Sequence, residues 1–199
     1  MPIERSERRV SSERLRTVAS RLLNASTLCA IATLSSGARP HLNPAYFAWN
    51  PEFDLFWLSA PEARHSRNLA KNSSAAVAVY DSSQTWGRPD RGIQLFGSAR
   101  EAAGVLARKA ELVYAKRFPR YPGKERDTYR FYRFHPRRMK LFDERALGSG
   151  TFVTANITSG RVAWVRTEVY RYEAQHLSSP PRGEGWVRGL SGLQDADAY

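Results

Sequence analysis

Residues 55–82 read LFWLSAPEARHSRNLAKNSSAAVAVYDS, and the interpretation of the whole chain depends on them. Leu55–Leu58 is a short apolar run with aromatic residues, which predicts a strand. Ser59 with Glu62 three residues later is a capping box, and the proline between them suits a first helical turn, so a helix is predicted to begin here. Ala75–Tyr80 reads as a second strand. The unit is therefore a strand, a helix of about ten to twelve residues and a strand, which is the size of a crossover connection.

The start of this helix carries residues suited to binding an anion. Free N–H groups at a helix N-terminus favour negative charge, and beside them the sequence places two hydroxyls, a guanidinium and an imidazole, those of Ser59, Ser66, Arg64 and His65. The planar fork of Arg64 can bind two phosphate oxygens at once. A solvated basic helix face with Ser59 as an ordinary cap explains the same motif equally well. The motif alone therefore leaves both interpretations open.

The order of these residues resembles a phosphate-binding segment of a known family. Ser59, then Arg64-His65, then Asn68-Leu69 and a strand of small residues follow one another as in the pyridoxamine 5'-phosphate oxidase-like family of flavin-binding split barrels. The likeness runs over about residues 28–172 and is strongest over 33–97. It implies a homodimer that holds FMN non-covalently at the interface between its subunits.

The resemblance also implies which residues contact the cofactor. Leu58, Ser59, Arg64 and His65 match the phosphate and ribityl positions, and the strand that begins at Asn43 matches the segment along the flavin ring. A Trp/Arg pair near the C-terminus resembles the pair that closes over the flavin. The implied cofactor-binding residues are Asn43, Pro44, Ala45, Tyr46, Leu58, Ser59, Arg64, His65, Ser66, Gln94, Trp164 and Arg166.

The rest of the chain is predicted to contain mostly antiparallel strands. Expected helices are Ser12–Asn24 and Glu101–Phe118, and expected strands are Thr27–Leu34, His41–Trp49, Ile93–Ala99, Phe152–Ile157, Val162–Tyr172 and a hairpin of Tyr129–His135 with Arg138–Phe142 about His135-Pro136. The expected fold is mainly β with helices (α+β), an antiparallel split β-barrel. The expected divisions are an N-terminal arm and helix (1–24), the flavin-binding barrel (25–172) and a mobile C-terminal tail (173–199).

Composition and charge restrict the possible partners and compartments. The 199 residues carry a net charge of +12, mostly from arginines spread along the chain rather than clustered as in a nucleic-acid-binding module. Apolar runs are too short to span a membrane, and the charged N-terminus has no secretion signal behind it, so a cytoplasmic protein is expected. Cys29, the single cysteine, excludes an internal disulfide and is expected to be buried.

The sequence offers little support for other kinds of catalytic site. Its four histidines and one cysteine show no metal-ligand spacing, and neither a G-x-S-x-G elbow nor a phosphate loop is present. No catalytic residue is assigned. Vitamin B6 oxidation is not expected, because members with that activity often carry Lys in place of His65 and because their C-terminal Arg-x-His motif is not visible.

The interpretation that follows is an FMN-dependent oxidoreductase, which passes a hydride between a reduced nicotinamide and a small-molecule substrate. Two alternatives stay open. Related split barrels use a deazaflavin or haem, and His41 or His65 could in principle ligate haem iron. A non-catalytic cofactor-binding protein or a basic regulator of nucleic acid is the other alternative.

Overall fold

Strands dominate the protein, whose computed structural model describes residues 3–123 and 128–170. The elements in chain order are β1 (Ile3–Ser6), α1 (Ser12–Ala25), β2 (Leu28–Leu34), β3 (Pro40–Tyr46), β4 (Ala48–Trp49), β5 (Leu55–Ser59), α2 (Arg64–Lys71), β6 (Ser74–Tyr80), β7 (Arg91–Glu101), α3 (Gly104–Arg117), β8 (Arg130–Asp143), α4 (Glu144–Leu147), β9 (Thr151–Thr158) and β10 (Arg161–Tyr170). The predicted tail over 173–199 lies outside the described residues.

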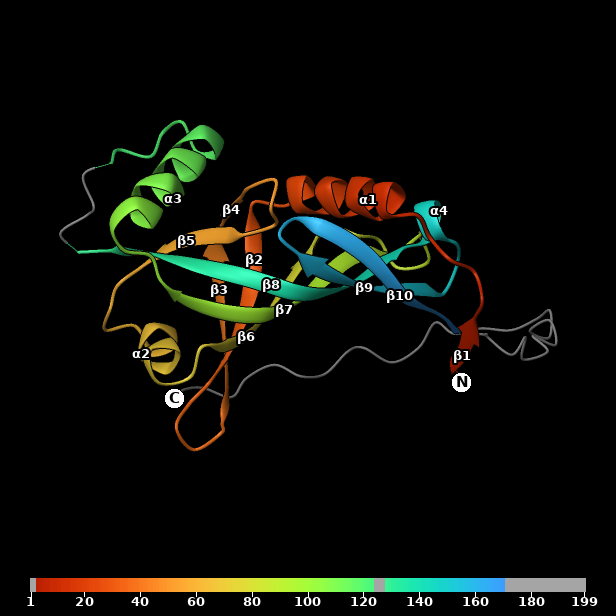
Figure 1. Cartoon of the computed structure of the whole chain (residues 1–199), viewed down its shortest axis with the longest axis horizontal. Helices are drawn as coiled ribbons and strands as arrows, with labels where there is room; N and C mark the ends of the chain where they lie inside the picture. Colours follow the sequence, from red (N-terminus) through yellow and green to blue (C-terminus); the bar gives the residue numbers. More distant parts are fainter. Residues whose placement is uncertain (1–2, 124–127, 171–199) are drawn as a thin grey trace, which may run out of the picture.

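The sheet is antiparallel and branches at β8. Its main path is β1-β10-β9-β8-β7-β6-β2-β3, while β5 pairs with β4 and with β8. The first half of β8, from Arg130 to Phe134, pairs with β5, and Arg138–Phe142 pairs with β9. β7 runs beside both halves of β8, and Figure 1 shows β8 passing through most of the length of the molecule. This arrangement confirms the predicted antiparallel, mainly β fold.

The predicted hairpin about His135-Pro136 is wrong, because β8 continues through these residues as one strand. Phe96 lies opposite Arg138 and Gly97 lies opposite Pro136, so the register shifts by one residue at this point. Such a bulge tolerates a proline, because the ladder of hydrogen bonds is already interrupted there. A Cβ at Gly97 would collide with the carbonyl oxygen of His135, so glycine is what lets β7 approach the bulge.

Alternating burial along the strands builds the core. β2 and β6 each bury every second residue, as the period of two in an extended chain requires. α1 packs its apolar side chains on one face of the sheet (Figure 1). A second apolar cluster lies under α3, around Phe56, Tyr114 and Phe131. Together the two clusters fix the strands that carry the candidate site.

Several boundaries differ from those expected. The strand predicted over His41–Trp49 is divided into β3 and β4, and β3 ends the main path of the sheet, which suits Pro44 because a proline has no N–H to donate. α3 begins at Gly104, whereas Glu101 ends β7. The crossover unit joins β5 to β6, which are not neighbours in the sheet. β1 and α4 were not expected, since four residues are too few for a periodic pattern.

Candidate functional site

The turn between β5 and α2 holds the residues singled out by the sequence. α2 has eight residues and begins at Arg64, after Ala63, and no described side chain caps it. The predicted capping box is therefore wrong: Ser59 is still the last residue of β5, paired with Arg130. Its hydroxyl lies 2.6 Å from Nε2 of His65 instead of bonding the helix backbone.

Hydrogen bonds between buried polar side chains fix the position of α2. Ser66 Oγ donates to Ser59 Oγ over 3.2 Å, and Asn68 Nδ2 donates to Thr33 Oγ1 on β2 over 3.0 Å. All four of these residues, and His65, are buried. Buried polar groups are costly unless they are paired, so these pairs define how the start of α2 is presented.

Burial favours the neutral form of His65 over the cation. Burial, and to a smaller extent the charge of nearby His41, lowers the pKa of His65 below its ordinary value. The two rings are parallel, with centroids 6.4 Å apart, so they join α2 to β3. Because Ser66 donates to Ser59, the Ser59 hydroxyl can donate to Nε2 of a neutral imidazole. Positive charge for an anion must then come from other residues.

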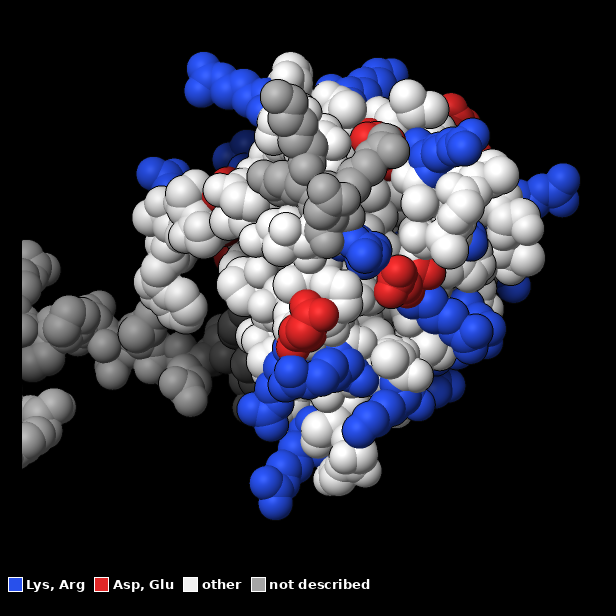
Figure 2. Space-filling model, turned by 90° about the vertical axis from the view of Figure 1, so that its left-hand side faces the viewer, with Lys and Arg blue, Asp and Glu red and all other residues white. Residues whose placement is uncertain are grey.

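Arginine and lysine side chains supply that charge. Arg64, Arg67 and Lys71 are exposed on α2, and no acidic residue occupies its first turn. Figure 2 shows Lys and Arg side chains along the lower part of the face that carries α2, with few acidic side chains between them. An uncapped helix N-terminus with a guanidinium beside it is a suitable site for a phosphate.

The structure brings together only part of the implied cofactor site. Ser59, His65 and Ser66 contact one another, Leu58 precedes them on β5 and Arg64 begins α2. The segment Asn43, Pro44, Ala45 and Tyr46 lies on β3, next to α2 through the stacked His41 and His65 rings. Tyr46 and Pro44 are exposed, and Asn43 Nδ2 donates to the carbonyl of Pro44 over 3.0 Å.

Three of the predicted cofactor-binding residues lie on strands away from the start of α2. Gln94 is exposed on β7, where its neighbours in register are Ala78 and Lys140. Trp164 and Arg166 are on β10, a strand that lies in the other half of the molecule from α2 (Figure 1). Trp164 Nε1 donates to Thr167 Oγ1 over 3.0 Å, and Arg166 Nε lies 3.0 Å from a carboxylate oxygen of Glu168. Their contact with a cofactor stays a prediction that requires a second subunit.

One polar cluster was missed by the sequence analysis. The buried carboxylate of Asp54 lies 2.8 Å from Nδ1 of His135 and 3.0 Å from Nε of Arg133, and Asn50 Nδ2 lies 3.4 Å from it. Asp54 directly precedes the predicted strand Leu55–Leu58, and His135 was assigned to a hairpin that does not exist, so no local pattern indicated their contact.

The described residues contain neither a candidate metal cluster nor a membrane-spanning helix. In the ranges 3–123 and 128–170 no group of three or more His, Cys, Asp or Glu side chains could hold a metal ion. No helix within the same ranges is long and apolar enough to cross a membrane.

Comparison with known proteins identifies the family. The sequence model of the family described as pyridoxamine 5'-phosphate oxidase matches residues 15–143. This chain belongs to the pyridoxamine 5'-phosphate oxidase-like family. The matched segment contains β5, α2 and β6, the unit from which the sequence analysis began. No curated protein sequence matches the chain.

Solved structures of low sequence identity share the fold. A Clostridium acetobutylicum protein of the pyridoxinephosphate oxidase family, related to general stress protein 26 of B. subtilis, is 12% identical, with a TM-score of 0.56 over 74% of this chain and 97% of that one. A heme binding protein from Mycobacterium smegmatis is 19% identical, with a TM-score of 0.55 over 78% of this chain and 60% of that one. The Vibrio cholerae heme storage protein HutZ is 20% identical, with a TM-score of 0.50 over 59% of this chain and 87% of that one. The likeness shows the split-barrel fold of the pyridoxamine 5'-phosphate oxidase-like family.

Proposed function

We propose that this protein binds FMN non-covalently as a homodimer and transfers a hydride between a reduced nicotinamide and a small-molecule substrate. The observation that supports the proposal is the start of α2, where N–H groups that no described side chain caps and the exposed guanidinium of Arg64 adjoin the buried Ser59–His65–Ser66 cluster. A flavin phosphate carries up to two negative charges, and this arrangement offers donors and positive charge for it.

Other residues of the chain fit the ring of a flavin. β3 runs beside α2 and exposes Tyr46 at the edge of the sheet, which offers an apolar surface for a ring. Asn43 on the same strand keeps its side-chain oxygen available as an acceptor, because its amide nitrogen is the atom that bonds Pro44. Trp164 and Arg166 would be contributed by the second subunit. FMN, when bound, supplies the redox chemistry, while these residues bind and orient it.

Haem binding without catalysis is the second candidate function, and the His41–His65 pair favours it. Two of the structural relatives are a heme binding protein and a heme storage protein. Since Nε2 of His65 is occupied by Ser59, His41 is the residue that would ligate iron in this chain. The Mycobacterium smegmatis relative is longer than this chain and is matched over 60% of its length, so its ligand is carried over as a proposal only.

The visible absorption spectrum of the freshly purified protein tests the proposal. A flavin spectrum, with release of FMN on denaturation and identification by mass, is the expected result. A Soret band would replace FMN with haem, and a released deazaflavin would keep the fold and change the cofactor. A colourless protein that also fails to bind added FMN would contradict the proposed function.

A further inference from the structure

A cleft of about 610 Å³ opens where β8 exchanges β5 for β9 as its partner. It lies between the bulge of β7 and β8 and the turn from β9 to β10. Three nitrogen-bearing side chains of one strand line it, those of His135, Arg137 and Arg138. No Asp or Glu is among the described residues that line it. The volume is within the range of small-molecule pockets.

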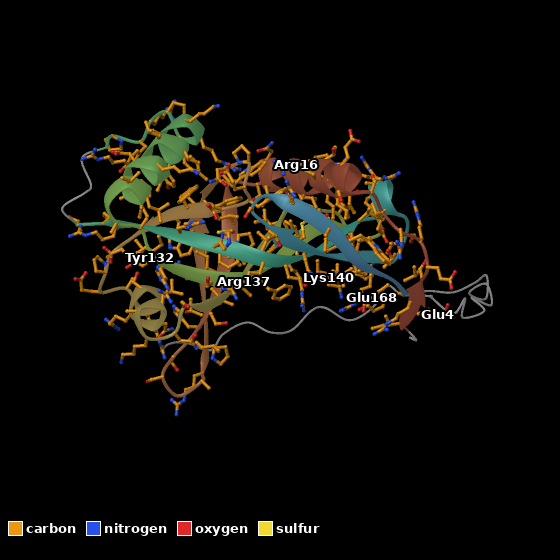
Figure 3. The ribbon with its side chains drawn as sticks, viewed as in Figure 1. Glu4, Arg16, Tyr132, Arg137, Lys140 and Glu168 are labelled. Carbon is orange, nitrogen blue, oxygen red and sulfur yellow. The ribbon has the colours of Figure 1, made fainter. Side chains whose placement is uncertain are left out.

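The bulge is the reason why these side chains converge. Successive residues of a regular strand point to opposite faces of the sheet, so adjacent arginines would normally diverge. Here Pro136 pairs with Gly97 and Arg138 pairs with Phe96, which leaves Arg137 as the extra residue. A bulge redirects side chains in this way, and both arginines border the same cleft. Figure 3 shows Arg137 on β8 between Tyr132 and Lys140.

The imidazole of His135 is held in place from behind the cleft. Its Nδ1 lies 2.8 Å from the Asp54 carboxylate and 3.1 Å from Nη2 of Arg133, so two charged neighbours occupy this ring atom. Asp54 is in turn held by Arg133 and by Asn50. Nε2 is then the ring atom left for a ligand.

The other walls of the cleft indicate what kind of anion would fit. Asn156 and Thr158 add an amide and a hydroxyl that can donate hydrogen bonds, and Phe96 offers an aromatic ring that is 40% exposed. Guanidinium forks match phosphate oxygens in pairs. We infer that this cleft binds an organic phosphomonoester, with its phosphate at His135, Arg137 and Arg138 and its organic group against Phe96.

Isothermal titration of the full-length protein with phenyl phosphate tests this inference, with FMN present in excess so that the phosphate site at α2 is filled. Arg137→Gln and Arg138→Gln are each expected to raise its Kd about tenfold or more, on the scale of one charged hydrogen bond. Arg145→Gln is the matched control, since it removes the same charge from an exposed position on α4 and should change Kd less than twofold. Phenyl phosphate should bind more tightly than inorganic phosphate because of Phe96.

Two results would overturn the inference: no binding of phenyl phosphate at millimolar concentration, or an equal loss of affinity in the Arg145→Gln control. Arg137 is exposed, so its variant tests the site without disturbing the core. The cleft and the flavin site can fail separately. Arg64→Ala should leave phenyl phosphate binding unchanged, whereas Arg137→Gln should leave FMN binding unchanged.

Discussion

Replacement of Arg64 by alanine is expected to weaken FMN binding about tenfold or more. A hydrogen bond between a guanidinium and a phosphate contributes about 1.5–3 kcal/mol. Arg64 is exposed, so screening by water places its contribution near the lower end, about 1.5 kcal/mol, which corresponds to about a tenfold change in Kd. Titration of the apoprotein with FMN, followed by flavin fluorescence, measures it.

Lys71→Ala provides the matched control on the same helix. Lys71 is exposed in the last turn of α2, about 10 Å along the axis from Arg64, beyond the screening length of about 8 Å at physiological salt. Its removal changes the net charge equally but should change Kd less than twofold. Unchanged affinity in Arg64→Ala, or equal losses in both variants, would refute a phosphate site at the start of α2.

Three further predictions concern stability and reactivity. The lowered pKa of His65 means that the unfolded chain binds a proton more readily than the folded one, so stability should fall as pH drops below about 6.5, and urea unfolding of His65→Gln should show a weaker pH dependence. Gly97→Ala should lower the free energy of unfolding by about 1–3 kcal/mol through its collision with the His135 carbonyl, whereas Gly37→Ala, whose Cβ meets nothing within 4 Å, should change it little. Burial raises the pKa of Cys29 to about 12, so the thiol should react with Ellman's reagent at pH 8 only after denaturation.

The parts of the fold that could be predicted from sequence are those with a clear local period. Ala75–Tyr80 alternates small and apolar residues, and β6 covers it. The helix expected over Ser12–Asn24 is α1 within one residue. Sequence rules for turns and helix caps gave wrong predictions where pairing between strands distant in sequence determines the local structure. Ser59 stays in β5 because it pairs with β8. The dipeptide His135-Pro136 resembles a turn, but it stays in β8 because it pairs with β7 beside the bulge.

The candidate site was predictable in part for the same reason. Arg64 and His65 are adjacent in sequence to Ser59, so a local motif places them together. The contact of Asp54 with His135 joins residues 81 positions apart, and it exists because β5 and β8 are neighbours. Nothing in a single sequence indicates which of several strands will be paired.

The sharing of β8 by two partners has a consequence for how the protein unfolds. Separation of either half of the sheet would leave one end of β8 without its neighbour and expose Phe134 or Met139, both fully buried on either side of the bulge. Neither half is therefore a foldon of its own, and the barrel should melt in a single cooperative transition, with the amides of β8 among the last to exchange with deuterium. A chain cut at the bulge would yield two fragments, each without the half of β8 that the other fragment contains.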